Sequence, residues 1–345
     1  MPRGMSVRGL ALALLTVVPV AAAQAQGPAE FFRGKTVDLY IAYSAGGAYD
    51  LYARMIARHL GKHIPGNPTV VPKNMEGAGG LRLANFLYNA APRDGTALGA
   101  TSRSTVFEPM LGNKAAQYDA AKFTWLGSAN DEVGVCVSWH ASGITRFDQL
   151  FTKEMTVGST GTGDDTYQFP RFVNNVLGTR MKIITGYPGG NDVSIAIERG
   201  EVDGRCGWSW SAVRSTRMSW VTEKKINLLM QFSLAKHAEL PDVPLIMERA
   251  TTDEQRAMFK FIFAPGDGPA VSGAARHPGG PPAGAAEGVH GYDGGQGFSR
   301  RGRQGTVRDQ AGLGRSAREA RGGRAQDPAG AGREGRRADE VRRPR

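Results

Sequence analysis

Three glycine-rich corners, each between a strand pattern and a helix pattern, constrain the fold of this chain most strongly. The first joins an apolar stretch at 36–43 to an amphipathic stretch at 50–60, and two more lie at 159–165 and 187–192. Because the N-terminus of a helix presents free backbone amides and a partial positive charge, each corner suits a carboxylate or a phosphate. Three such corners in one chain indicate a cleft for a small polar solute.

The order of the apolar segments predicts an α/β fold. Strand patterns at 36–43, 69–73 and 96–100 alternate with helix patterns, which is typical of a parallel sheet with crossover helices. The second half of the chain repeats this alternation. Its expected strands span 133–139, 155–158, 182–185 and 226–232, and its expected helices span 147–151, 166–177, 192–199 and 252–263.

The first 25 residues have the pattern of a secretory signal peptide. Arg3 and Arg8 precede an apolar run at 10–23, and the small residues up to Ala25 match a cleavage site. The apolar run is too short to span a bilayer comfortably. We therefore expect an exported protein that is cleaved near Ala25.

The composition changes sharply after Pro265. Of the 80 residues at 266–345, 20 are Gly and 15 are Arg, and none is Ile, Met, Trp, Cys or Lys. Such a segment buries too little apolar surface to offset the entropy of ordering, so we expect a disordered tail. Codons rich in G and C give this composition when they are translated out of frame. We therefore interpret the tail as the product of a frameshift near residue 265.

The alternative for the tail is a genuine nucleic-acid-binding segment rich in Arg and Gly. The tail carries more than half of the formal net charge of +11, so the rest of the chain is close to neutral. Aromatic residues for base stacking are almost absent from the tail, and the protein is expected to be exported. We therefore expect no nucleic-acid partner.

Cys136 and Cys206 are the only two cysteines of the chain. An exported compartment permits a disulfide between them, and the alternative is a pair of buried free thiols. The sequence alone does not decide between these alternatives.

Other chemical motifs are weak or missing. His59 and His63 have a metal-ligand spacing, but Gly61 separates them and no carboxylate or Cys completes the set, so we expect no metal. The complete glycine motif of nucleotide-binding proteins is missing, and no Ser/His/Asp set is legible, so we expect neither a cofactor nor catalysis. Trp208 and Trp210 suit either a solute ring or a core between two lobes.

The order of the glycine corners resembles one known family. The segment Gly46-Gly47-x-x-Asp50-x-x-x-Arg54, the corner at 74–80, the turn at 94–96 and the block at 189–204 are similar to the substrate-binding proteins of tripartite tricarboxylate transporters, the Bug family. The resemblance covers about residues 30–265. It implies a two-lobed periplasmic-binding-protein fold (type II, Venus flytrap) without catalytic activity, whose lobes close on a carboxylate-bearing solute.

The resemblance also implies a domain plan, a partner and a set of contacts. The first lobe would span 26–130 and the second 131–225, with 226–265 returning to the first lobe and further helices completing it. We expect a monomer that delivers a carboxylate, an amino acid or an aromatic acid to membrane transporter subunits; the alternative is an exported α/β hydrolase or a partner of a membrane sensor. The residues implied at the solute are Tyr43, Ser44, Gly46, Gly47, Ala48, Tyr49, Ser102, Ser159, Thr160, Gly161, Thr162, Gly163, Tyr187, Gly189, Gly190 and Asp192.

This chain departs from the family pattern at its corners. Ala42 stands where the family often has Pro, and Ala48-Tyr49 where it often has Ser or Thr. Asp164 and Asp165 put two carboxylates at a corner that usually has small neutral residues. The bulk of Tyr49 and the charge of the two aspartates bear on the size and the charge of the solute.

Overall fold

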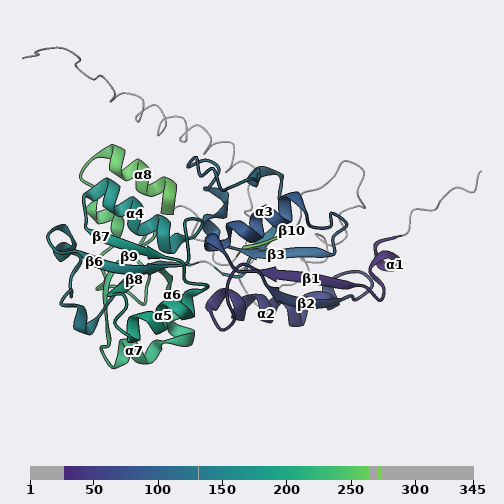
Figure 1. Ribbon diagram of the computed structural model, residues 1–345, viewed down its shortest axis with the longest axis horizontal. Helices are drawn as coiled ribbons and strands as arrows, with labels where there is room; N and C mark the ends of the chain where they lie inside the picture. Colours follow the sequence, from purple (N-terminus) through teal and green to yellow (C-terminus); the bar gives the residue numbers. More distant parts are fainter. Residues whose placement is uncertain (1–26, 131, 264–269, 274–345) are drawn as a thin grey trace, which may run out of the picture.

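Two α/β lobes lie side by side, each built around one five-stranded sheet (Figure 1). The computed structural model describes residues 27–130, 132–263 and 270–273. The expected signal peptide and most of the expected tail lie outside these residues. The expected α/β fold with two lobes is confirmed by the two separate sheets.

The sheet of the first lobe has a parallel part and an antiparallel part. Its strands follow the order β2 (Thr69–Asn74), β1 (Thr36–Ile41), β3 (Ala97–Thr101), β10 (Ala270–Gly273) and β4 (Thr124–Ser128). β1 pairs in parallel with β2 and β3, as the alternating pattern predicts, whereas β10 runs antiparallel to β3 and β4. The helices of this lobe are α1 (Pro28–Phe32), α2 (Ala48–Leu60) and α3 (Leu81–Asn89).

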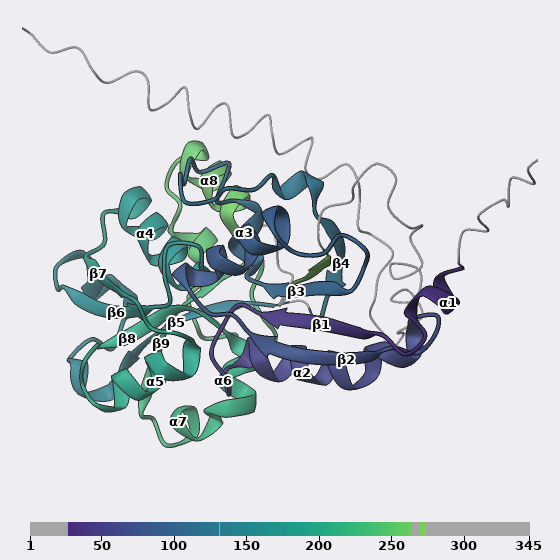
Figure 2. The same cartoon turned by 45° about the vertical axis from the view of Figure 1, so that its right-hand side comes forward.

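Helices α2 and α3 cover opposite faces of this sheet (Figure 2). Val37 and Leu39, two residues apart on β1, are fully buried and pack with Ala53 and Ala57 of α2. Tyr40, on the other face of the strand, packs with the core around α3. Small residues on α2 let the helix approach the sheet closely, which places its N-terminus beside the end of β1.

The sheet of the second lobe also mixes parallel and antiparallel pairs. Its strands follow the order β7 (Met181–Thr185), β6 (Met155–Ser159), β8 (Gly204–Ser209), β5 (Gly134–Trp139) and β9 (Ile226–Phe232). β6 is parallel to β7 and β8, and β5 is antiparallel to β8 and β9.

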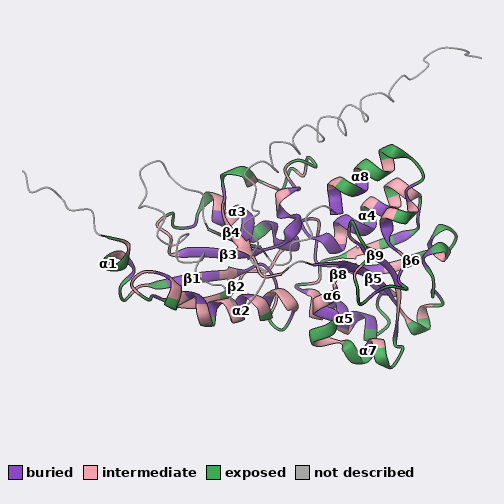
Figure 3. Cartoon of the chain, turned by 180° about the vertical axis from the view of Figure 1, so that it is seen from behind, coloured by how far each residue is buried: buried purple, intermediate pink, exposed green. Residues whose placement is uncertain are grey.

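Buried residues follow both sheets, and exposed residues lie on the outer helices (Figure 3). The helices are α4 (Asp165–Leu177), α5 (Gly190–Glu198), α6 (Trp210–Thr216), α7 (Met218–Thr222) and α8 (Asp253–Phe263), and the helix expected at 147–151 is a 3-10 turn.

The expected return to the first lobe is wrong for residues 226–263, the described part of the segment 226–265. β9 pairs with β5 along its whole length, inside the second sheet. Helix α8 stays in the same lobe because Phe263 packs against Phe232 of β9 and Phe169 of α4, with ring centroids 5.4 and 4.9 Å apart. One face of α8 is buried in the core of the second lobe through Phe259, Ile262 and Phe263, and its Phe261 also contacts Phe107 of the first lobe at 5.3 Å between ring centroids.

Part of the expected tail also belongs to the fold. Ala270–Gly273 forms β10, which fills the slot between β3 and β4 of the first sheet. Sheet pairing uses backbone hydrogen bonds, which composition does not predict. The expectation of disorder throughout 266–345 is therefore wrong for these four residues, and the other residues of the tail lie outside those described.

Cys136 and Cys206 form a disulfide within the second lobe. Cys136 lies on β5 and Cys206 on β8, and these two strands are neighbours in the sheet. The bond closes a loop with a sequence separation of 70 residues. Of the two alternatives that the sequence leaves open, the structure contains the paired one.

Candidate functional site

A small cavity lies between the two lobes. Its volume is about 30 Å³, which is room for about two water molecules. The residues that line it come from both lobes: Tyr43, Gly46, Gly47, Ala48, Tyr49, Thr160, Asp164, Asp165, Gly190, Asn191, Ser194, Arg205, Gly207, Trp208, Ser209, Ala212 and Thr216.

The first wall of the cavity is the glycine corner between β1 and α2. Asp50, in the first turn of α2, accepts hydrogen bonds from the backbone of Gly46 at 3.0 Å, from Arg54 Nε at 2.8 Å and from Asn74 Nδ2 at 2.9 Å. Burial raises the pKa of Asp50, but these three donors lower it more, so the net shift is downward. Asn74 also donates to the carbonyl of Tyr43 at 2.7 Å. The spacing of Gly46, Asp50 and Arg54 in the sequence thus fixes the shape of this corner.

Two helix N-termini face each other across the cavity. Gly47 is the N-cap of α2 and Gly189 is the N-cap of α5, and neither end has a side-chain cap. A Cβ added at Gly47 would lie 3.9 Å from the backbone nitrogens of both Gly190 and Asn191. Free amides at helix N-termini stabilise anions. Two such ends from opposite lobes make the cavity suitable for a carboxylate.

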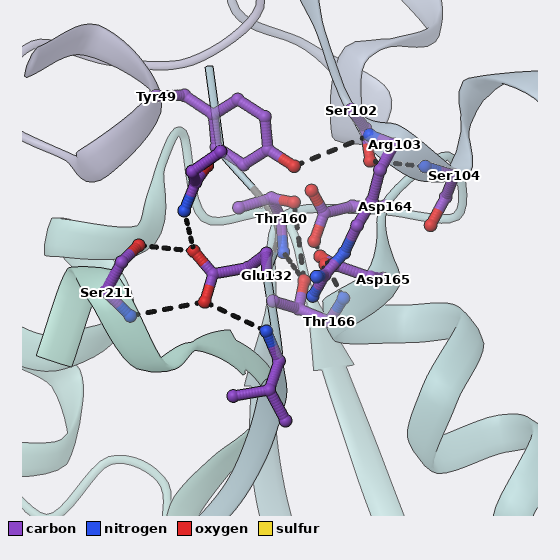
Figure 4. Close-up of polar contacts among 12 residues, drawn as sticks. Tyr49, Ser102, Arg103, Ser104, Glu132, Thr160, Asp164, Asp165, Thr166 and Ser211 are labelled. Atoms are coloured by element: carbon purple, nitrogen blue, oxygen red, sulfur yellow. Dashed lines mark hydrogen bonds and ion pairs between the residues drawn. The ribbon is translucent and has the colours of Figure 1, made fainter. Parts of the chain in front are cut away.

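A buried network of charges adjoins these helix ends (Figure 4). Arg103 of the first lobe donates from Nε to Asp165 of the second lobe at 2.6 Å, and its second ion-pair contact is 2.5 Å long. The Tyr43 hydroxyl donates to Asp164, the N-cap of α4, which also accepts from the backbone of Thr166 at 2.7 Å. The two aspartates that depart from the family pattern therefore have partners from the first lobe.

Burial raises the pKa of Asp165 to about 8, and the charge of Asp164 raises it as well, although Arg103 lowers it. The pKa of this group in the folded protein is higher than in an unfolded chain, where an aspartate titrates near 4. The folded state therefore binds more protons than the unfolded state between about pH 4 and pH 8. The contribution of Asp165 to the free energy of unfolding is therefore fully present below this range. It decreases as pH rises through the range, by at most about 1.4 kcal/mol per pH unit for one proton.

We expect Asp165→Asn to flatten this pH dependence. The amide keeps the shape of the side chain but does not titrate, so the change in melting temperature between pH 5 and pH 8 should be smaller than in the wild type. Asp242→Asn, at an exposed position, is the control and should keep the wild-type slope. Equal slopes in Asp165→Asn and in the wild type would contradict the assignment.

Arg205 on β8 has an unusual environment. It is 9% exposed and its Nη1 donates to the carbonyl of Gly190 at 2.9 Å. Its guanidinium lies over the ring of Trp208, 5.1 Å from the centroid. Its Nε has no hydrogen-bond partner, and among the described residues no carboxylate forms an ion pair with it.

The lobes touch each other directly around the cavity. Ser44 Oγ donates to Asp192 of the second lobe at 2.6 Å, and the backbone of Gly163 donates to the carbonyl of Ala78 at 3.2 Å. Gly79 has a φ of +66°, and a Cβ there would come within 2.8 Å of the backbone nitrogen of Asp164. The arrangement is a closed one, so a solute larger than the cavity needs the lobes to separate for entry.

Some of the residues expected at the solute line this cavity. They are Tyr43, Gly46, Gly47, Ala48, Tyr49, Thr160 and Gly190. The rings of Tyr43 and Tyr49 lie 4.6 Å apart, so both tyrosines fill space in the cleft.

The other expected residues lie around the cavity, in turns or in contacts between the lobes. Ser44, Asp192 and Gly189 meet at the contact between the two facing corners, and Gly161 and Gly163 meet residues 78 and 79 of the first lobe. Ser102 caps a 3-10 turn by accepting from the backbone of Ser104, and Ser159 accepts from the backbone of Gly161. The carbonyl of Thr162 accepts from Gln168, and the hydroxyl of Tyr187 donates to Glu201 at 3.5 Å.

The sequence did not point to Arg205, Asn191 or Ser194 as lining residues. Asn191 lies inside the predicted corner at 187–192 without being singled out there, and Ser194 lies two residues beyond it, so extending the corner by one helical turn would have found Ser194. Trp208 lines the cavity and belongs to the core of the second lobe as well, whereas Trp210 is buried in that core and donates to Glu239 at 2.7 Å.

No metal site or membrane-spanning helix was found in the described part of the chain. Within residues 27–130, 132–263 and 270–273, no group of three or more His, Cys, Asp or Glu side chains is placed to hold a metal ion. Over the same residues, none of the helices combines the length and the apolar character needed to cross a bilayer.

Two α/β lobes with a cavity between them are the fold of periplasmic binding proteins, and solved structures share this fold. The periplasmic binding protein BugD matches with a TM-score of 0.58 at 18% identity, over 74% of this chain and 80% of that one. MatC from Rhodopseudomonas palustris, solved with malate, matches with a TM-score of 0.57 at 20% identity, over 74% and 83% of the chains. An R. palustris protein solved with adipate matches with a TM-score of 0.58 at 17% identity, over 83% and 95%.

Sequence comparison finds relatives that cover most of the chain. No protein-family model matches the chain. A UPF0065 protein of Agrobacterium vitis is 25% identical over 77% of this chain and 75% of its own length, and one of Bordetella bronchiseptica is 28% identical over 76% and 78%. Over about three quarters of its length the chain is therefore similar to UPF0065 proteins, in agreement with the resemblance to the Bug family in the sequence. These similarities favour a solute-binding protein over the hydrolase alternative.

Proposed function

We propose that this protein captures a small carboxylate-bearing solute in the periplasm and delivers it to a tripartite tricarboxylate-type membrane transporter. The observation that carries the proposal is the pair of uncapped helix N-termini, α2 and α5, that face each other across the cavity. Closing the lobes on a carboxylate would satisfy amides from both sides at once. The relatives solved with malate and adipate support this solute class.

The proposed contacts follow from the same geometry. The solute would touch the backbone of the first corner at Gly46, Gly47 and Ala48, and that of the second lobe at Thr160 and Gly190. Export through the N-terminal signal peptide is part of the proposal, since a periplasmic receptor must cross the inner membrane.

A binding screen tests the proposal. The purified protein is mixed with malate, adipate, amino acids and aromatic acids, and its melting temperature is recorded. A ligand that binds only the folded state raises that temperature, and isothermal titration calorimetry then gives the affinity. We expect at least one small carboxylate to stabilise the protein without being converted. Conversion of the solute to a product, or stabilisation by none of the carboxylates, would contradict the proposal.

We expect Gly47→Val to block solute binding while the protein still folds. Gly47 has a φ of −82°, which valine adopts, and a Cβ there would make an ordinary contact with the nearest backbone nitrogens, 3.9 Å away. The two methyl groups of valine would enter the gap between the helix N-termini. The affinity for the best carboxylate should fall by at least about tenfold, which is ~1.4 kcal/mol.

Gly27→Val is the matched control for this variant. A Cβ added at Gly27 meets nothing within 4 Å, so the same substitution there should leave the affinity unchanged. If Gly47→Val binds the solute within about threefold of the wild type, under 1 kcal/mol, the corner is not the site.

A further inference from the structure

We propose that Arg205 forms the ion pair with the carboxylate of the solute and thereby selects acids over their neutral analogues. This inference rests on the proposed function, and it adds a side chain to a site otherwise made of backbone amides. The three observations behind it are the burial of Arg205, its lack of a carboxylate partner and its place in the wall of the cavity.

The two buried arginines near the cavity differ in their partners. Arg103 contacts the carboxyl group of Asp165 in the other lobe at 2.5 Å. Asp164 accepts from Tyr43 and from the backbone of Thr166. Arg205 has one neutral partner, the carbonyl of Gly190. Of the two arginines, Arg205 is therefore the one whose guanidinium contacts no carboxyl group among the described residues.

A buried cation without an opposite charge is costly. Burial lowers the pKa of Arg205, whereas the more distant Asp164 and Asp165 raise it, and the net shift is downward. A carboxylate in the cavity would supply the missing charge. A guanidinium has five N–H donors and matches the planar shape of a carboxylate. The hydrogen bond to the carbonyl of Gly190 uses one of these donors, so others are left for a carboxylate.

The surroundings hold Arg205 in a fixed position. The ring of Trp208 lies on one side of the guanidinium. Gly190, the first residue of α5, lies close on another, and a Cβ there would come within 2.6 Å of Nη2 and 2.7 Å of Nη1. The free amides at the start of α5 therefore lie next to the guanidinium. A carboxylate between them would accept from both, and the side chain loses little further entropy when it binds because it is already ordered.

The experiment compares acids with their amides. Propionate, malate and adipate are titrated into the wild-type protein by calorimetry, together with propionamide, malamide and adipamide, which have nearly the same shape without the charge. We expect the tightest acid to bind at least about 30-fold more tightly than its amide, as for a buried charge pair. Arg205→Gln should lose at least about 30-fold in affinity for that acid and bind the amide within about threefold of the wild type.

Two further variants complete the design. Arg205→Lys keeps the charge without the planar fork, so it should recover part of the lost affinity. Arg214→Gln, which removes a half-exposed arginine paired with Glu239, should bind like the wild type. Unfolding of each variant without ligand is recorded to show that it folds.

The outcomes separate the two proposals. If no acid of the panel binds the wild type, the proposed function fails and the role of Arg205 fails with it. If acids bind but Arg205→Gln retains the affinity within about threefold, or amides bind as well as acids, the role of Arg205 is overturned while the solute receptor stands. If Arg205→Gln does not fold, the acid-to-amide ratio of the wild type decides, and a ratio below about threefold overturns the role.

Discussion

Removing the disulfide between Cys136 and Cys206 is expected to lower the free energy of unfolding by about 4 to 5 kcal/mol. The bond closes a loop with a sequence separation of 70 residues, and the cross-link reduces the entropy of the unfolded chain by an amount that grows with this length. Both cysteines are buried, with exposures of 1% and 0%, so the double variant with Ala at both positions avoids buried free thiols. Urea unfolding of the variant and of the wild type measures the difference.

Two measurements check this prediction independently. Alkylation of unreduced protein followed by mass spectrometry should label no thiol, and the wild type in a strong reductant should become nearly as unstable as the double variant. Two labelled thiols in the unreduced protein would show that the bond is not formed. A difference below about 1 kcal/mol would show that the cross-link does not stabilise the second lobe.

Local patterns predicted most of the first lobe. The parallel pairs of β1 with β2 and β3 follow from alternating strand and helix patterns, because a short crossover leaves few other arrangements. The corners at the starts of α2 and α5 were also visible, since glycines between an apolar strand and an amphipathic helix form a local pattern. These features depend on neighbours in the sequence.

The central strand of the second sheet was missed. β8 contains Gly204 and Gly207 as well as Arg205, and glycine and a charged residue are both uncommon inside a buried strand. Its five buried positions depend on β5, β6 and α4, which come from distant parts of the sequence. Missing this strand also meant missing Arg205, because a basic residue after a turn resembles a surface position.

The contacts between the lobes were beyond the reach of sequence patterns. The Tyr43–Asp164 and Ser44–Asp192 pairs join residues separated by 121 and 148 positions. Nothing in either local segment specifies its partner. The sequence therefore predicted the two corners of the cleft, but not the charge network that joins them.

If the tail is the product of a frameshift, as its composition indicates, restoring the reading frame downstream of α8 should make the protein more stable by several kcal/mol. All five residues of β4 are half-buried, and no described helix packs extensively on β4 or β10. Mixed α/β sheets usually have both faces covered, and the family resemblance implies helices that complete this lobe. Covering a few hundred Å² of apolar surface contributes several kcal/mol at roughly 25 cal/mol per Å², which is comparable with the whole stability of a typical domain.

Paired expression of the two versions tests this expectation. The chain as written should be cleaved faster in limited proteolysis, because uncovered sheet faces favour local opening. The frame-restored version should resist the protease and respond to the solute in the thermal-shift screen. A third version that ends after residue 273 separates the loss of the helices from any effect of the tail itself, and it should behave like the chain as written. Equal protease resistance of residues 26–265 in the written and the restored versions would show that the missing segment covers nothing that the fold needs.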